Sequence, residues 1–150
     1  MIKHKVLMKT ILGISIITLL LVSSCKVEPE QINYGKDGCH FCKMTIVDNQ
    51  HASELVTDKG KVYKYDAIEC LINDLKKRDS AEVGMLLVND YNNPGGLISA
   101  ESATFLISEG VPSPMGAFLS AFSDNADAET VKSESGGELF DWQAVRKQIK

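Results

Sequence analysis

Six residues, from Cys39 to Met44, bring together two thiols, an imidazole and a thioether in the order Cys-His-Phe-Cys-Lys-Met. Thiolate and thioether sulfur atoms are soft ligands that favour Cu(I), whereas carboxylate and carbonyl oxygen atoms suit Mg, Ca or Mn. Side chains two residues apart on a strand point the same way, so an extended segment would place His40, Cys42 and Met44 on one face. This pattern predicts a copper site on Cys42 and Met44, with His40 on the same face and Cys39 as an auxiliary thiol.

Three further residues bear on the site. Met115 lies in the proline-bounded loop 110–116, where it either fills the core or closes the copper site from the other half of the chain. Cys70 lies in a helical pattern of apolar residues, so we expect it to be a buried small apolar residue. His51 begins a predicted strand, and we expect it on the surface rather than as a ligand.

Other chemistries remain open for the same six residues. The Cys-x-x-Cys spacing of Cys39 and Cys42 fits a thioredoxin-like redox pair, although that motif normally opens a helix and branched residues follow it here. A structural zinc site usually has a second Cys or His pair, which the sequence lacks. A plain Cys39–Cys42 disulfide would leave His40 and Met44 without a role. We find no paired carboxylates at an apolar pocket, no Ser-His-Asp set and no glycine-rich phosphate loop.

The N-terminus is typical of a lipoprotein leader. Three lysines precede an apolar run over residues 11–22, which is too short for a comfortable transmembrane helix. Small residues then precede Cys25, as in a secretory signal peptide with a lipobox. We therefore expect residues 1–24 to be a lipoprotein signal peptide, Cys25 to be acylated as the first mature residue, and residues 25–36 to be a lipidated tether. Several acyl chains on one residue would anchor the protein firmly to a membrane, at the cell envelope.

The mature chain from Cys25 would have 126 residues, which suits one domain, here residues 37–150. Thirteen basic and twenty acidic residues give it a formal charge of about −7. So acidic a chain repels nucleic acid, and no basic stripe offsets this. Setting Cys25 aside leaves three cysteines, an odd number that does not suit a pure disulfide scaffold.

The elements around these residues indicate an α+β domain. It has two similar halves, each made of antiparallel strands followed by a helix. Asp66 and Glu69 fit a capping box at the start of the first helix. Strands are expected at 44–47, 52–57, 62–65, 85–88, 97–98, 103–107 and 139–140, a turn at 92–96, helices at 66–78, 127–135 and 141–149, and either type at 117–122.

The chain resembles the NosL family, lipoproteins that assist the assembly of nitrous oxide reductase. The resemblance covers nearly all of the mature chain. It is carried by Cys25, Tyr34-Gly35, His40-Phe41-Cys42-Lys43-Met44, the segments 61–66 and 88–91, and Pro114-Met115-Gly116-Ala117. Many relatives carry Cys-x-Met without a preceding cysteine, so Cys39 is a departure. It would add a second thiolate or let a disulfide shut the site.

This resemblance implies a membrane-anchored Cu(I) chaperone, not an enzyme, that faces the periplasm or exterior. It would deliver copper for nitrous oxide reductase, with that enzyme and its membrane maturation complex as partners. The family's ligands map to Cys42 and Met44, with Met115 and His40 assisting. An exposed site of few ligands can also be shared between two chains, which would give a homodimer. The alternative is an envelope thiol–disulfide oxidoreductase that uses Cys39 and Cys42. We expect Cys42→Ser to abolish tight Cu(I) binding and Cys70→Ser to leave it nearly intact.

Overall fold

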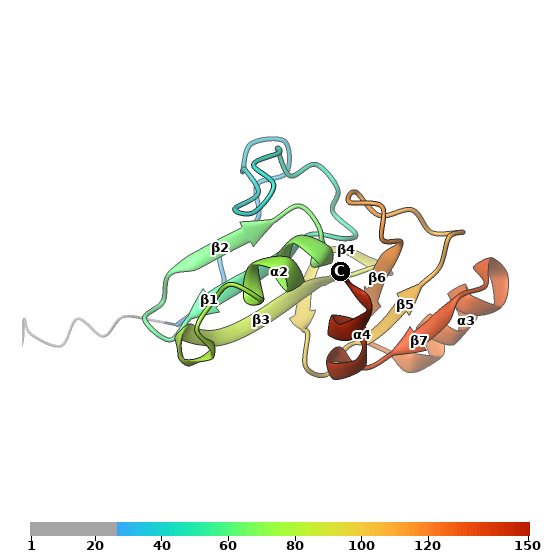
Figure 1. Ribbon diagram of the computed structural model, residues 1–150. Coiled ribbons are helices and arrows are strands. Elements are labelled where there is room, and N and C mark those ends of the chain that lie inside the picture. Colours follow the sequence, from blue (N-terminus) through green and yellow to red (C-terminus); the bar gives the residue numbers. More distant parts are fainter. Residues whose placement is uncertain (1–26) are drawn as a thin grey trace, which may run out of the picture.

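A computed structural model describes residues 27–150, and this range contains two antiparallel sheets and three α-helices (Figure 1). The predicted signal peptide and Cys25 lie outside the described residues. The first sheet has the order β2-β1-β3-β4, and the second has the order β6-β5-β7. Antiparallel strands with helices packed on them confirm the expected α+β class.

The first sheet forms from a hairpin and a longer strand pair. Its strands are β1 Ser53–Thr57, β2 Val62–Tyr65, β3 Val83–Asp90 and β4 Asn93–Ser99. The turn between the predicted strands 52–57 and 62–65 joins β1 to β2, and its Gly60 adopts a φ of +78° that favours glycine. The expected turn at 92–96 is only partly right, because the chain from Asn93 onwards already pairs as β4.

Helix α2, Ile68–Leu75, packs on this sheet through Ile68, Leu71 and Ile72, which repeat at helical spacing and are all buried. The predicted capping box is wrong. The N-cap residue is Ala67, and no side chain caps the helix. Asp66 and Glu69 are instead both buried and directed to neighbouring loops.

The second sheet is covered on both faces. Its strands are β5 Thr104–Ile107, β6 Leu119–Phe122 and β7 Glu138–Phe140, and its helices are α3 Asn125–Ser135 and α4 Trp142–Gln148. Phe105 and Leu106 point to opposite faces because they are consecutive on β5. Phe105 joins the main core, where its ring centroid lies 5.6 Å from that of Trp142 on α4, whereas Leu106 packs with Ala128 of α3.

The main core continues across both sheets. It includes Leu55 of β1, Ile68 of α2, Phe105 of β5 and Leu119 of β6. The chain before β1 contributes too, since Ile32 is buried in the same core and Glu30 N–H donates to Glu54 Oε1 at 2.9 Å. Part of the expected tether therefore lies against the domain.

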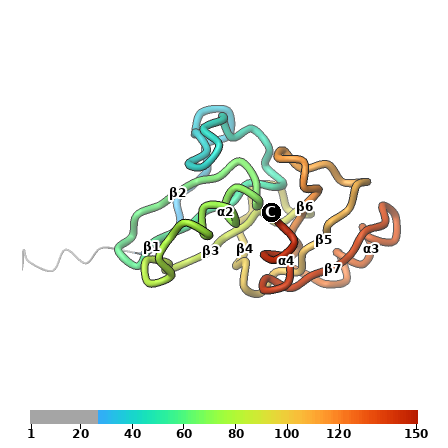
Figure 2. Tube along the Cα trace, in the orientation of Figure 1, coloured from blue at the N-terminus to red at the C-terminus, as the bar shows by residue number. Residues whose placement is uncertain are grey.

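Two loops rise from one edge of the molecule, at the top of Figure 1, and the tube in Figure 2 follows both. One, the cysteine loop, contains residues 37–52 and carries Cys39 and Cys42. The other joins β5 to β6 and carries Met115. Within residues 27–150, no helix is long and apolar enough to cross a membrane.

Candidate metal centre

Residues 38–45 form a closed turn attached to β2, not the start of a strand. A bridge pairs Gly38 with Thr45, and Cys39 N–H donates to the Met44 carbonyl at 2.7 Å. His40 N–H donates to the carbonyl of Lys64 on β2 at 2.8 Å. Lys43 adopts a φ of +67°, a left-handed conformation that no strand contains. The predicted strand at 44–47 is therefore wrong, and so is the placement of three ligands on its face.

The turn brings three sulfur atoms together. The Sγ atoms of Cys39, Cys42 and Cys70 all lie within 4.8 Å of one another, and all three residues are free thiols. Cys39 and Cys70 are buried, whereas Cys42 is partly exposed. Cys70 is buried as expected, but it is not an isolated core residue. The structure adds it to the two thiols that the motif identified.

The spacing of the sulfurs suits a soft metal ion. A thiolate–zinc bond is about 2.3 Å, and three sulfurs at that distance around one ion stand about 4 Å apart. The observed separations reach this value with small side-chain movements. Three thiolates favour Cu(I) or Zn among biological metals. The structural-zinc alternative would still need a fourth ligand, and among residues 27–150 no His or carboxylate completes the group.

Cys39 is the sulfur most easily ionised. The Cys70 thiol donates a hydrogen bond to it, and the backbone N–H groups of Asp66 and Cys42 add further bonds, the latter at 3.5 Å. Burial opposes ionisation, but the hydrogen bonds outweigh it and lower the pKa of Cys39 to about 4. These hydrogen bonds favour the thiolate form of Cys39.

The thiols of Cys42 and Cys70 lose their protons less easily, because both have a raised pKa. Burial raises the pKa of Cys42, and the negative Cys39 nearby raises it further. The hydrogen bond that Cys70 donates to Cys39 is the largest cause of the raised pKa of Cys70, with burial second. A metal ion that binds all three sulfurs would release both protons.

The two methionines lie at the surface on separate loops. Met44 is 56% exposed and follows Cys42 by two residues, and its backbone N–H donates to the Cys42 sulfur. Met115 is 42% exposed and lines a cavity of about 470 Å³ together with Glu69 and Asn73 of α2. The loop of Met115 is attached to α2 next to Cys70, because Ser113 Oγ donates to Glu69 Oε1.

His40 stands beside the sulfurs rather than among them. Its ring centroid lies 4.5 Å from that of Tyr63 and 6.2 Å from that of Tyr65. Burial is the main cause of its lowered pKa, and Lys43, Arg78 and Lys61 lower it further against the opposing charge of Asp74. The imidazole is therefore neutral at pH 7 and retains a nitrogen able to accept a proton or a metal.

An Asp-His-Ser arrangement that the sequence did not reveal lies near the site. His51 Nδ1 is 3.0 Å from Asp48 Oδ1, and His51 Nε2 is 3.1 Å from Ser120 Oγ. Ser120 is fully buried and His51 is only 3% exposed, so the hydroxyl cannot meet a substrate. The expectation of a surface His51 is wrong. The three residues join the cysteine loop to β6.

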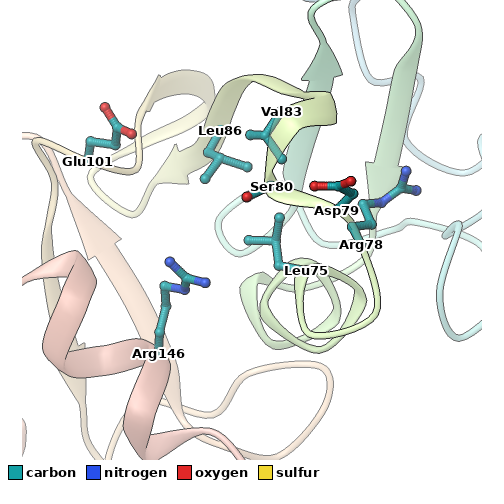
Figure 3. Close-up of a pocket in the computed structure, with 8 residues that line it drawn as sticks. All are labelled: Leu75, Arg78, Asp79, Ser80, Val83, Leu86, Glu101 and Arg146. Carbon is teal, nitrogen blue, oxygen red and sulfur yellow. The ribbon is translucent and has the colours of Figure 1, made fainter.

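The cavity drawn in Figure 3 offers no soft ligand. It encloses about 250 Å³ between α2, the start of β3 and α4. Its lining residues are Leu75, Arg78, Asp79, Ser80, Val83, Leu86, Glu101 and Arg146. The three sulfurs thus remain the best candidate site in the described chain.

Comparison with known proteins shows the family and the fold of this chain. The sequence model of the NosL family matches residues 31–149. The chain is 25% identical over 124 residues to the "Copper-binding lipoprotein NosL" of Stutzerimonas stutzeri; the match covers 77% of this chain and 65% of that protein. The crystal structure of the copper chaperone NosL from Shewanella denitrificans has the same fold, with a TM-score of 0.69, 24% identity, and coverage of 79% of this chain and 95% of that one. The family match extends over almost the whole described chain, and the protein belongs to the NosL family.

Proposed function

We propose that this protein is a non-enzymatic Cu(I) chaperone, anchored at the cell envelope through acylated Cys25. It supplies copper for the assembly of nitrous oxide reductase, together with that enzyme's membrane maturation complex. The observation that carries this proposal is the convergence of the three sulfurs of Cys39, Cys42 and Cys70. Copper binding by a NosL protein, as in the name of the relative from Stutzerimonas stutzeri, supports the same assignment.

The three sulfurs take different parts in the proposed cycle. Cys39 offers a buried thiolate, and Cys70 a buried thiol beside it. Cys42 is partly exposed and followed closely by the exposed Met44, so it can hold copper while a partner's ligand approaches. Met115 enters from the neighbouring loop as a thioether, and the neutral His40 nitrogen assists at the rim of the site.

The difference in exposure between the buried Cys39 and Cys70 and the partly exposed Cys42 suits a protein that transfers copper rather than one that stores it. A carrier must hold Cu(I) away from water yet surrender it to another set of ligands. Buried thiolates provide the first property, and an exposed thiol and thioether allow ligand exchange, as soft ligands suit Cu(I).

The oxidoreductase alternative fits the structure less well. Reactive cysteines combine a lowered pKa with solvent access. Here the cysteine with the lowered pKa, Cys39, is only 2% exposed, and the accessible Cys42 has a raised pKa. The pair also lies on a turn rather than at the N-terminus of a helix.

The test is an anaerobic titration of the reduced full-length chain in detergent with Cu(I), against a chromophoric Cu(I) chelator. Cys42→Ser and the double variant Met44→Ile with Met115→Ile accompany it. We expect tight binding of about one ion, abolished by Cys42→Ser and weakened in the double variant. An equal Cu(I) affinity in the wild type and the double methionine variant would mean that only the thiols are ligands. An absence of binding would overturn the proposal and leave the cluster a structural or redox one.

Delivery and anchoring need separate measurements. Incubation of the loaded chain with copper-free nitrous oxide reductase should restore that enzyme's copper, whereas free chelated copper should not.

Mass spectrometry should find acyl chains on Cys25, and Cys25→Ala should move the protein from the membrane fraction to the soluble one. A soluble wild-type protein would contradict the anchor.

A further inference from the structure

Four basic side chains lie on the cysteine turn or against the aromatic rings beside it, in a chain that is otherwise acidic. We call Lys43, Lys61, Lys77 and Arg78 the cationic rim. From residue 79 to the end, the sequence contains eleven acidic and only four basic residues. The rim therefore stands out against the charge of the rest of the molecule.

Two members of the rim contact one aromatic ring beside the cysteine turn. Lys61 Nζ lies 4.7 Å from the centroid of the Tyr63 ring, and Arg78 Cζ lies 3.9 Å from it. The same ring packs against His40 in the cysteine turn. Lys61 and Arg78 are thus linked through Tyr63 to His40, the residue that follows Cys39.

The remaining two members lie on the cysteine turn and on α2. Lys43 Nζ donates to the carbonyl of His40, so this cation lies over the turn itself. Lys77 Nζ lies 4.9 Å from the centroid of the Phe41 ring, which brings the C-terminal end of α2 to the same turn. Cys42 is flanked in sequence by Phe41 and Lys43, so the rim borders the sulfur through which copper would leave.

Most of this positive charge is not neutralised within the domain. Arg78 forms an ion pair with Asp74. In contrast, the structure of residues 27–150 shows no ion pair for Lys43, Lys61 or Lys77, and all three are exposed. Asp58 and Glu82 line the same cavity as Lys61, but neither forms an ion pair with it. Exposed ammonium groups without an ion pair favour the approach of an anionic surface.

We propose that the cationic rim is the docking surface for an acidic patch on the protein that exchanges copper with this chain. The inference rests on the proposed function and names the chemistry of the partner at the same site. A partner's ligands must approach Cys42 and Met44 to take the ion, so its surface must face the rim. Complementary charge speeds such an encounter and fixes its orientation more than it strengthens binding.

A protein partner suits this position better than a lipid surface. Lipid headgroups offer no soft ligand to receive Cu(I), and a membrane lying on the rim would cover Cys42. A docked protein can bring its own thiols or thioethers to the same place. The partner is therefore expected to carry carboxylates around its copper ligands.

The experiment measures copper transfer from the loaded full-length chain in neutral phosphatidylcholine vesicles. The acceptors are two synthetic peptides with the same Cys and Met ligands and matched Cu(I) affinity, one flanked by aspartates and the other by lysines. The rim variant is Lys61→Glu with Lys77→Glu. The control is Lys132→Glu with Lys147→Glu, which makes the same change in net charge on α3 and α4. Chelator competition gives the Cu(I) affinity of each variant.

We expect the acidic peptide to remove copper at least about tenfold faster than the basic one at low ionic strength. The advantage should fall as salt is added. It should disappear in the rim variant and persist in the control, with Cu(I) affinity unchanged in both.

Three results would overturn the inference. Equal rates for the two peptides would mean that the rim does not select a partner. A rim variant with an altered Cu(I) affinity but the same ratio of transfer rates to the two peptides would mean that the cations only offset the negative charge of the thiolates. Transfer that slows in phosphatidylglycerol vesicles, only while the rim is intact, would assign the rim to the membrane. A wild-type chain that binds no Cu(I) would instead overturn the proposed function, and the inference with it.

Discussion

At the scale of single residues, the three cysteines of the candidate metal centre differ in their acidity and in their exposure to solvent. Hydrogen bonds from Cys70 and from two backbone N–H groups make Cys39 the anionic member. Burial keeps Cys70 away from solvent, whereas Cys42 is partly exposed. Under the proposed function, Cys42 is therefore the sulfur that a partner's ligand would meet. The sulfur atom that ionises most easily, that of Cys39, is therefore not the one that solvent reaches most easily, that of Cys42.

The position of Cys70 reverses the expectation that its removal would be harmless. Cys70→Ser replaces a soft sulfur by a hard oxygen within 4.8 Å of the other two thiols. We expect Cu(I) affinity to fall at least about tenfold, because one of three thiolates is lost. Ile72→Val on the same helix is the control, since it costs about 0.5–1.5 kcal/mol of stability and removes no ligand. An unchanged affinity in Cys70→Ser, by chelator competition, would return Cys70 to the core.

Copper affinity should rise with pH. Cys39 is already ionised above a pH of about 4, but Cys42 and Cys70 have raised pKa values and must lose their protons to bind. Linkage then predicts a dissociation constant that falls by about one decade per pH unit for each proton released. Chelator titrations between pH 6 and 8, with the chelator's own titration subtracted, give the slope. A slope near two indicates that both thiols bind, whereas a flat profile would contradict thiol ligation by either.

At the scale of elements, the sequence predicted the strands and helices well and the functional turn poorly. The β1–β2 hairpin, β3, β5 and the three helices match periodic patterns and turn signals. The turn at 38–45 does not, because Met44-Thr45-Ile46-Val47 has the composition of a strand while its hydrogen bonds close a loop. Its shape depends on the contact of His40 with β2, which no local pattern encodes.

The same limit explains why Cys70 was missed. The motif revealed Cys39 and Cys42 because they are adjacent in sequence, whereas Cys70 reaches them only when α2 packs beside the turn. Asp66 and Glu69 were misassigned as helix caps for a similar reason. The buried Asp66 carboxylate lies beside the Cys39 turn and accepts from Val47 N–H, and Glu69 accepts from Ser113, contacts that exist only in the folded domain.

Glu69 is expected to hold the Met115 loop against α2. Glu69 is 2% exposed, its carboxylate accepts from Ser113 Oγ, and burial raises its pKa. Glu69→Ala should release the loop at a cost of about 1–3 kcal/mol, because the loop hydroxyl loses its partner. Hydrogen exchange at residues 113–117 should accelerate, while exchange in β1 stays slow. Glu69→Gln is the control, since its amide oxygen can still accept from Ser113. Equal protection of the loop in all three proteins would show that other contacts hold it.

At the scale of the whole molecule, two sheets share one core. Leu55, Ile68, Phe105 and Trp142 belong to a single cluster of buried side chains, although the first two come from the first sheet and its helix. A domain of this size with one continuous core unfolds as a unit. The three cysteines, on the turn and on α2, are therefore coupled through packing to the second sheet.

The single tryptophan makes this coupling measurable. Trp142 lies on α4 against Phe105, in the half of the domain that contributes none of the three cysteines. Cu(I) at a hundredfold excess over its dissociation constant should stabilise the native state by about 2.7 kcal/mol. If the core is cooperative, the Trp142 fluorescence transition should shift to higher denaturant by the same free energy as the far-ultraviolet circular dichroism transition.

Two variants test whether packing between the two sheets transmits the copper-induced stabilisation to Trp142. Phe105→Ala should lower the free energy of unfolding by about 3–5 kcal/mol yet keep the copper-induced shift, because Phe105 is not one of the three cysteines. Met85→Ala, at a side chain 39% exposed on β3, should change stability by less than about 0.5 kcal/mol. A copper shift seen by circular dichroism but absent from Trp142 fluorescence would mean that the two sheets unfold separately. In that case the metal would stabilise only the half that binds it.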